Sequence, residues 1–235
     1  MSAADAVITS QVDHLVVAAA TLDEAVAWCE QALGINPAPG GEHPLMGTHN
    51  RLLSIASPQF PDAYLELIAI NSGAVCARSA GLKRWFDLDD GEMQNQLTQN
   101  GPRLIHFVAR TALATAAVRA LHGVGLDRGE VLEASRPTAH GLLSWKISVR
   151  GDGQRLLHGA LPTLIEWGSV HPAHSLPGSG ISLRTLRASH PCPDTLRRAW
   201  AAVGLQGVGF QSGAPNLCAV LDGPCGSVTI ESQGV

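Results

Sequence analysis

Two histidine–glutamate pairs occupy matching places in the sequence. Glu66 and Glu166 each lie inside a short apolar run, in a chain that is poor in charge. His14 and His106 lie midway along earlier apolar runs, at similar separations from the two glutamates. A carboxylate without a partner is costly in an apolar strand, and imidazole with carboxylate is a common ligand set for divalent metals. The repetition favours a shared functional site, most simply a metal site, over two separate hydrogen-bonded structural pairs.

Alternation along the strands supports this interpretation. Successive side chains of a strand point to opposite faces, so the apolar neighbours of each glutamate could pack against a helix while the glutamate faces away. The histidines stand in the same relation to their own apolar neighbours. These neighbours are Leu15, Leu65 and Leu67 in the first unit, and Ile105, Phe107, Ile165 and Trp167 in the second. We therefore expect each unit to present one imidazole and one carboxylate on the face away from its helix.

A second group of polar residues lies between residues 40 and 53. His43, Thr48 and Asn50 follow the glycine pair at 40–41 and are predicted substrate-binding residues, with His43 also a proton-transfer residue. As structure alone, the segment is a turn leading into a hairpin. His171 and His174 follow the second unit in a proline-flanked loop, where we expect them to be exposed.

The elements that must position these residues recur along the chain. In the first unit an apolar strand run at 11–20 precedes Thr21 and Glu24, which fit a capping box, and the helical stripe that follows ends at Gly34. A glycine- and proline-rich connection at 36–41 leads to strands at 50–56 and 63–70. The second unit is predicted to have a strand at 103–108, a helix at 111–124, and strands at 142–149, 155–158 and 163–167. A third, shorter unit has a strand at 181–186, a helix from Pro193 to Gly204, and strands at 217–221 and 227–231.

A strand, a helix and then several strands, repeated along the chain, indicate an α+β fold. Residues 71–100 are predicted to connect units one and two, with a short helix, and residues 168–180 to link units two and three. The phosphate-binding pattern GxGxxG, the nucleophile pattern GxSxG in its strand–helix context, and the metal patterns CxxC and HExxH do not occur.

Composition excludes several classes of function. The 235 residues are 45% apolar and 15% charged, with net charge −4 and only two lysines against ten histidines. This balance gives no basic surface for nucleic acid or an anionic membrane, and no run reaches the roughly 18 apolar residues of a membrane span. The acidic N-terminus does not resemble a signal peptide, and five scattered cysteines indicate reduced thiols. We therefore expect a cytoplasmic protein that binds neither nucleic acid nor a membrane.

The sequence resembles the vicinal oxygen chelate superfamily, and more closely its glyoxalase-like domain proteins. The resemblance rests on three segments: VDHLV at 12–16, GGEHP leading into GTHNRLL at 40–53, and YLELI at 64–68. Over residues 101–172 it is looser and depends on LP before IEW and on HP at 171–172. The third unit resembles only a degenerate copy of the module.

The resemblance implies βαβββ modules that form curved mixed sheets with helices on the outer face. The modules would span 1–73 and 101–172, with a connection at 74–100 and a degenerate third βα-type module at 177–235. First and last strands are neighbours in this module, which would place His14 beside Glu66 and His106 beside Glu166. Which modules face each other across the cleft stays open with three units present.

The same resemblance implies a divalent metal in the cleft: Zn, Ni, Mn or Fe(II). The set His14, Glu66, His106 and Glu166 is similar to that of glyoxalase I, and three of them, without Glu66, resemble the ligands of extradiol dioxygenases. A metal-dependent lyase or isomerase acting on a small-molecule substrate with vicinal oxygens is the leading hypothesis, with Glu166 or His43 moving the proton. The alternatives are an Fe(II) dioxygenase and a metal-free binding or resistance protein in which His14 and Glu66 form a buried pair. We expect a homodimer.

Overall fold

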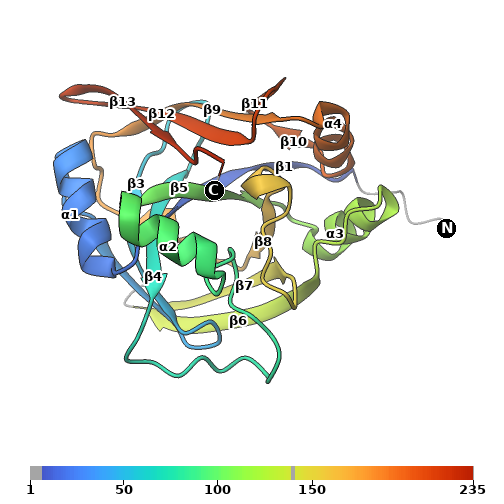
Figure 1. Cartoon of the computed structure of the whole chain (residues 1–235), viewed down its shortest axis with the longest axis horizontal. Helices are drawn as coiled ribbons and strands as arrows, with labels where there is room; N and C mark the ends of the chain where they lie inside the picture. The colour runs from blue at the N-terminus through green and yellow to red at the C-terminus, as the bar shows by residue number, and fades with distance from the viewer. Residues whose placement is uncertain (1–6, 139–140, 235) are drawn as a thin grey trace.

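A computed structural model describes residues 7–138 and 141–234 (Figure 1). Within these ranges no helix is both long and apolar enough to cross a bilayer. The helices are α1 (Leu22–Leu33), α2 (Gly91–Asn100), α3 (Ala114–Gly123) and α4 (Pro193–Ala202), with short 3₁₀ turns at Leu157–Gly159 and Pro172–Ser175. The strands are β1 (Ser10–Ala18), β2 (Ala38–His43), β3 (Thr48–Ser54), β4 (Tyr64–Ile70), β5 (Arg103–Arg110), β6 (Glu130–Thr138), β7 (Gly141–Val149), β8 (Thr163–Trp167), β9 (Ser182–His190), β10 (Leu205–Gln206), β11 (Val208–Ser212), β12 (Asn216–Gly223) and β13 (Gly226–Glu231).

The first two units share one curved sheet. Its strand order is β2-β3-β4-β1-β5-β8-β7-β6, with β10 alongside the start of β1. Within each unit the first strand runs parallel to the last, β1 with β4 and β5 with β8. The units join through their first strands, because β1 and β5 pair antiparallel. The α+β fold of repeated βαβββ modules is as predicted, and modules one and two face each other within one chain.

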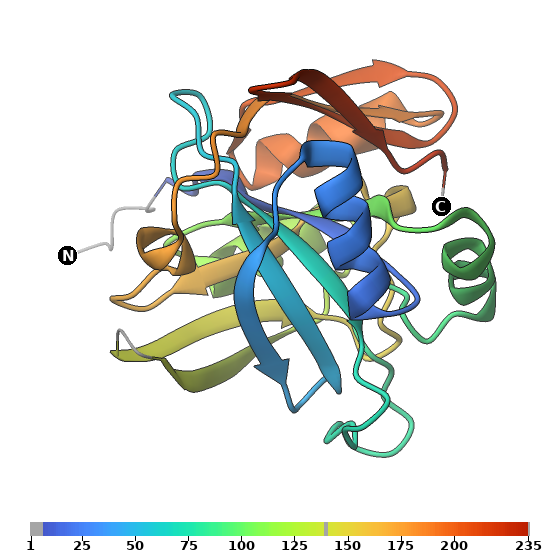
Figure 2. The same cartoon turned by 90° about the vertical axis from the view of Figure 1, so that its left-hand side faces the viewer.

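Helix α1 covers the outer face of the first module (Figure 2). The Thr21 side chain accepts the Glu24 amide, and Gly34 ends the helix at φ 71°, as the sequence predicts. Leu65 and Leu67 of β4 belong to the core cluster that includes the buried face of this helix. Glu66 therefore points to the concave face, as expected from alternation.

Each of the two central strands contains a β-bulge. In β1 the pairs Val12–Ala109 and His14–Val108 leave Asp13 as an extra residue. In β5 the pairs Val16–His106 and Val17–Leu104 leave Ile105 as the extra residue. A bulge interrupts alternation and re-aims neighbouring side chains. The alternation predicted for the second module is therefore wrong at Ile105, which packs in the core of the concave face, while Leu104 packs in the outer core.

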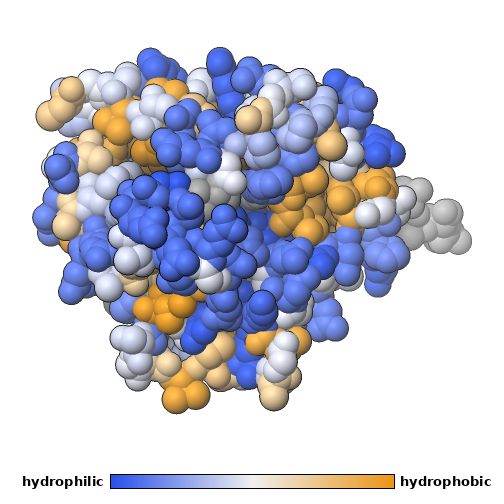
Figure 3. All heavy atoms as spheres, viewed as in Figure 1, coloured by the Kyte–Doolittle hydropathy of each residue, from blue (hydrophilic) through white to orange (hydrophobic). Residues whose placement is uncertain are grey.

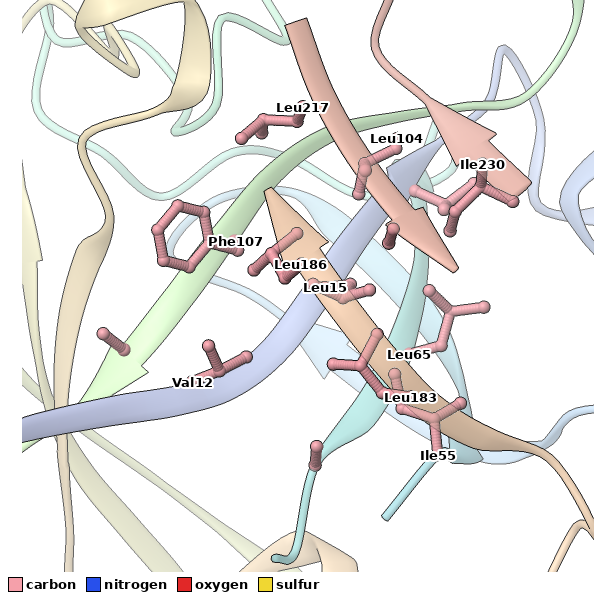
Figure 4. Close-up of a cluster of buried hydrophobic side chains, with 14 of the residues drawn as sticks. Val12, Leu15, Ile55, Leu65, Leu104, Phe107, Leu183, Leu186, Leu217 and Ile230 are labelled. Carbon is pink, nitrogen blue, oxygen red and sulfur yellow. The ribbon is translucent and has the colours of Figure 1, made fainter. Parts of the chain in front are cut away.

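The third unit forms a separate sheet over the outer face. Its order is β11-β9-β12-β13, and α4 packs with it at the top of the view in Figure 1. Apolar side chains of this sheet meet those of β1, β4 and β5 in one cluster (Figure 4). The labelled members from the third unit are Leu183, Leu186, Leu217 and Ile230. The third unit thus buries the back of the strands that carry His14, Glu66 and His106.

The connection between the modules closes one side of the concave face. Trp85, Phe86 and Leu88 join Met93 and Leu97 of α2 in the concave-face core. The opposite side of α2 is polar and lies on the hydrophilic surface seen in Figure 3. The short helix expected between units one and two is present at 91–100.

Both edge strands of the large sheet, β2 and β6, lie in segments where no strand was expected. Strand β2 contains Pro39, Gly40 and Gly41, which are unfavourable inside a sheet but tolerated at an edge. A Cβ on Gly41 would overlap the guanidinium of Arg136 from β6, so the two edges of the curved sheet approach each other there. The strand predicted at 155–158 is wrong, because Leu156, Leu157 and His158 have positive φ and lead into a 3₁₀ turn.

Gly40→Ala is expected to destabilise the fold by about 1–3 kcal/mol, because a Cβ there would lie 2.5 Å from the backbone carbonyl oxygen of Asn50. Gly123→Ala is the matched control, since nothing lies within 4 Å of its added Cβ at the end of α3. We expect the control to be neutral or to stabilise by up to about 1 kcal/mol. Urea unfolding measures both variants, and equal midpoints would contradict the close approach of β2 to β3.

Candidate functional site

A small pocket with a cavity volume of about 40 Å³ lies on the concave face between the two modules. The first module supplies a polar wall, and the second supplies a mostly apolar and aromatic wall. The lining residues are His14, His43, Asn50, Leu52, Tyr64 and Glu66 from the first module, Trp85 and Phe86 from the connection, and Arg136, Leu143, Trp145, Ile147, Ile165, Trp167 and Pro172 from the second module and the loop after it.

His14 lies between two carboxylates. Its Nδ1 is 2.6 Å from Asp13 Oδ1, and its Nε2 is 3.5 Å from Glu66 Oε2. Its ring also stacks on Tyr64 with centroids 4.5 Å apart. Burial alone would lower the pKa of His14, but hydrogen bonds to Asp13 and Glu66 outweigh burial and raise the pKa to about 9. His14 is therefore an imidazolium at neutral pH, held in a fixed orientation.

Asp13 is fully buried and is the acceptor at the centre of this group. Besides His14, its carboxylate accepts Trp167 Nε1 at 2.9 Å and His171 Nε2 at 3.0 Å. Burial acts to raise the pKa of Asp13, but the hydrogen bonds from His14 and His171 hold it well below its ordinary value. The exposure expected for His171 is wrong, since this side chain is buried against Asp13, whereas His174 is exposed.

Glu66 is a buried carboxylate that stays ionised. Asn50 Nδ2 donates to its Oε1 at 2.6 Å, and His14 lies beside its other oxygen. Burial acts to raise the pKa of Glu66, but the hydrogen bond and charge of His14 prevail and lower it. The predicted pairing of His14 with Glu66 is present in the structure.

His43 is the second titratable side chain beside Glu66. Its Nε2 lies 4.0 Å from Glu66 Oε1, and its Nδ1 is 3.1 Å from Thr48 Oγ1. Asn50 donates toward Nε2 at 3.4 Å, which favours the tautomer with the proton on Nδ1. Burial lowers the pKa of His43 to about 4, so the ring is neutral at pH 7. Asn50 is itself fixed, because its Oδ1 accepts the Gly41 amide at 2.8 Å.

His106 does not share the pocket with His14. Its Nδ1 bonds the Gly159 carbonyl at 2.9 Å, and its Nε2 accepts the Thr163 amide at 3.1 Å. Arg128 is buried beside this ring and donates to Thr163 Oγ1 and to the Pro162 carbonyl. Burial, and then the charge of Arg128, lower the pKa of His106 well below its ordinary value. The ring thus satisfies a polar network inside the second module.

Glu166 is not beside His106. Its neighbours Ile165 and Trp167 line the pocket, so Glu166 points to the outer face. There it accepts the amide of Ala114 at the start of α3 at 3.0 Å and pairs with Lys146 at 3.1 Å. An acidic group at this end of a helix is favourable, which gives Glu166 a structural role.

The register of β8 explains this difference between the modules. In the first module Val16, two residues after His14, pairs with Glu66. In the second module Val108, two residues after His106, pairs with Thr163. Thr163 therefore holds the place that Glu66 holds in the first module. A glutamate three residues further along the strand lies on the other face.

The predicted metal ligands consequently do not assemble. His14 and Glu66 meet, but His106 and Glu166 lie elsewhere, so neither the four-residue set nor the three-residue dioxygenase set is gathered. Among residues 7–138 and 141–234 no group of three or more His, Cys, Asp or Glu side chains is arranged to hold a metal ion. Both ring nitrogens of His14 already face carboxylates. The donor set does not fit a divalent metal in this arrangement.

Several pocket residues are absent from the sequence-based set. Arg136 and Trp85 come from segments whose place in the fold was not evident from periodicity, whereas Trp145 lies in a strand that was predicted. Asp13 stands directly before His14. An aspartate next to a histidine inside an apolar run is a sequence signal that could have indicated a pocket residue. Its side chain reaches the histidine only because of the bulge in β1.

Fold and site define a two-module βαβββ protein with a buried His–Glu pair in its cleft. The model of the glyoxalase-like domain family matches residues 12–204, and the chain belongs to this family. The match confirms the resemblance to the vicinal oxygen chelate superfamily. A comparison with curated protein sequences gives no match.

The comparison with solved structures gives matches of low sequence identity. A hypothetical protein from Staphylococcus aureus is 14% identical with a TM-score of 0.57, over 87% of this chain and 86% of that one. A variant methylmalonyl-CoA epimerase from Streptomyces coelicolor, in complex with 2-nitronate-propionyl-CoA, is 18% identical with a TM-score of 0.42, over 70% and 99% of the two chains. Methylmalonyl-CoA epimerase from Mycobacterium tuberculosis is 18% identical with a TM-score of 0.37, over 71% of this chain and 91% of that one.

The stability of the protein is expected to fall as pH rises through about 9. Folding raises the pKa of His14 from 6.5, so its contribution is complete below pH 6.5 and is lost as pH passes the folded value. The loss is on the order of 3 kcal/mol. Urea unfolding at pH 6 to 10 measures it, and the exposed-histidine variant His174→Gln should behave like wild type. NMR titration of His14 in wild type provides a second test, and an apparent pKa near 6.5 would contradict the arrangement.

Protein purified without added metal is expected to contain well below one divalent ion per chain. The reason is that His14 and Glu66 are the only two of the predicted ligands brought together. Elemental analysis measures this, before and after incubation with Zn, Ni, Mn or Fe(II), and EDTA should leave the melting temperature unchanged. Stoichiometric metal that disappears in both His14→Ala and Glu66→Ala would restore the metal hypothesis.

Proposed function

We propose that this chain is an enzyme, an isomerase or lyase, that moves a proton on a small substrate with vicinal oxygens. The observation that supports this most is the pair of proton acceptors in one pocket. Glu66 is ionised and His43 is neutral, and their nearest polar atoms are 4.0 Å apart. A carboxylate and a neutral imidazole in these states can accept a proton from a carbon acid and exchange it.

The proposed division of labour follows the hydrogen bonds. Glu66 accepts the substrate proton, because it is the charged acceptor exposed to the pocket. His43 exchanges that proton through Nε2, which the tautomer leaves without a hydrogen. The imidazolium of His14 lies beside Glu66, and its positive charge stabilises negative charge that develops on a substrate oxygen, while the hydrogen bond from Asn50 orients the Glu66 carboxylate. Thr48 keeps the His43 ring oriented through Nδ1.

The aromatic wall determines how water is excluded. Trp85, Trp145 and Trp167 line the pocket. The ring centroid of Trp85 lies 5.0 Å from that of His43, and Trp167 donates to Asp13. Such walls cover a small substrate and strengthen the electrostatic interactions beside it. The same wall favours a second candidate, a metal-free binding protein that holds a small molecule without reaction.

The predicted divalent metal remains a hypothesis that the donor geometry does not favour, and the predicted homodimer remains to be measured.

Glu66→Gln is expected to lower proton exchange by about 10²–10⁴-fold, since the amide cannot accept the proton. The measurement is loss of carbon-bound proton signals by NMR in D₂O, with pyruvate, 2-oxobutyrate and the hemithioacetal of methylglyoxal as probes. The protein is tested as purified and after dialysis against EDTA.

Glu42→Gln is the matched control, because Glu42 is exposed on the same edge strand as His43. The control should exchange at the wild-type rate. Equal rates in Glu66→Gln and wild type would overturn the proposed role. Binding of these probes without exchange in wild type would favour the binding protein.

A further inference from the structure

We propose that Arg136 is the residue that binds a carboxylate of the substrate, so that the ligand class is a small carboxylic acid with an oxygen on the adjacent carbon. This inference rests on the proposed function for the identity of the substrate. It adds a binding residue from the second module to a pocket whose predicted substrate contacts all lie in the first.

Arg136 reaches the pocket from the far edge of the curved sheet. It lies on β6 and lines the pocket together with His14, Asn50 and Glu66, which come from the opposite side. Its guanidinium passes over Gly41, where a Cβ would overlap Nη1 and lie 3.2 Å from Nη2. The missing side chain at Gly41 is therefore what admits the guanidinium at this place.

The guanidinium has no anionic partner within the described part of the chain. No ion pair of Arg136 occurs there, and its buried Nε has no hydrogen-bond partner. Arg78 and Arg103 share this unpartnered Nε but do not line the pocket, whereas four other arginines, buried or part-buried, are paired with carboxylates. These are Arg84 with Asp89, Arg110 with Asp62, Arg150 with Asp152, and Arg155 with Asp87. An unpaired guanidinium with a buried nitrogen is costly unless a ligand supplies the acceptor.

The charges in the pocket leave Arg136 available for such a ligand. The imidazolium of His14 is already shared between Asp13 and Glu66. Asn50 is occupied by Glu66 and by the Gly41 amide. A guanidinium presents its donors in a planar fork that matches a carboxylate, which makes this residue type suited to a carboxylate rather than to a neutral carbonyl.

The experiment compares oxalate with oxamide, its neutral analogue, by calorimetry and tryptophan fluorescence in the presence of EDTA. Wild type is expected to bind oxalate and to bind oxamide at least about 10-fold more weakly. Arg136→Met should weaken oxalate binding at least about 10-fold. Arg136→Lys should have an intermediate oxalate affinity, because a lysine lacks the planar, two-pronged donor arrangement of a guanidinium. The matched control Arg119→Met removes an exposed arginine of α3 and should bind like wild type.

Gly41→Ala provides a second test with Arg136 intact, because its Cβ displaces the guanidinium and should weaken oxalate in the same direction. Equal oxalate affinity in Arg136→Met and wild type, equal affinity for oxamide and oxalate, or no oxalate binding by wild type would overturn the inference. Failure of the proposed function looks different: oxalate binding would still depend on Arg136, but no probe would exchange a proton.

Discussion

The carboxylate of Asp13 is the interaction on which the pocket depends. It is fully buried and accepts hydrogen bonds from His14, Trp167 and His171, which belong to β1, β8 and the loop after β8. One buried acceptor thus ties the first module to the end of the second. It also keeps His14 protonated, and the charge of His14 in turn keeps Glu66 ionised inside an apolar fold. Removing one partner from such a group typically costs about 3–5 kcal/mol.

The two modules have the same topology but use it differently. Each first strand has a bulge next to its histidine, at Asp13 in β1 and at Ile105 in β5. In the first module the bulge brings an acid to the pocket histidine, and β4 supplies Glu66. In the second module the corresponding position of β8 is Thr163, and the histidine turns into a network with the buried Arg128. The second module instead contributes the aromatic wall and the edge strand that carries Arg136.

Local sequence patterns were sufficient to predict the two modules and half of the candidate site. Alternation around Glu66 and the caps of α1 depend on neighbours in sequence, and both were predicted correctly. The position of Glu166 depends on the register between β5 and β8, which a bulge and an irregular turn at 156–158 determine. The strand that begins at Ala38 was interpreted as a loop, because its proline and glycines are stable in a strand only at a sheet edge. No local pattern indicates that this edge meets β6.

The charges explain why a proton transfer suits this pocket. Asp13 and Glu66 flank the single positive charge of His14, which leaves one excess negative charge in an apolar cleft. Arg136, from the opposite edge, brings a second positive charge to the same pocket. In the proposed reaction Glu66 accepts a proton from a substrate carbon and loses its charge, while the substrate oxygen gains one. The total charge of the pocket stays constant. The negative charge that leaves Glu66 stays near the fixed cations and does not enter the apolar wall. Charges that are already in place can stabilise it without reorganisation of the pocket.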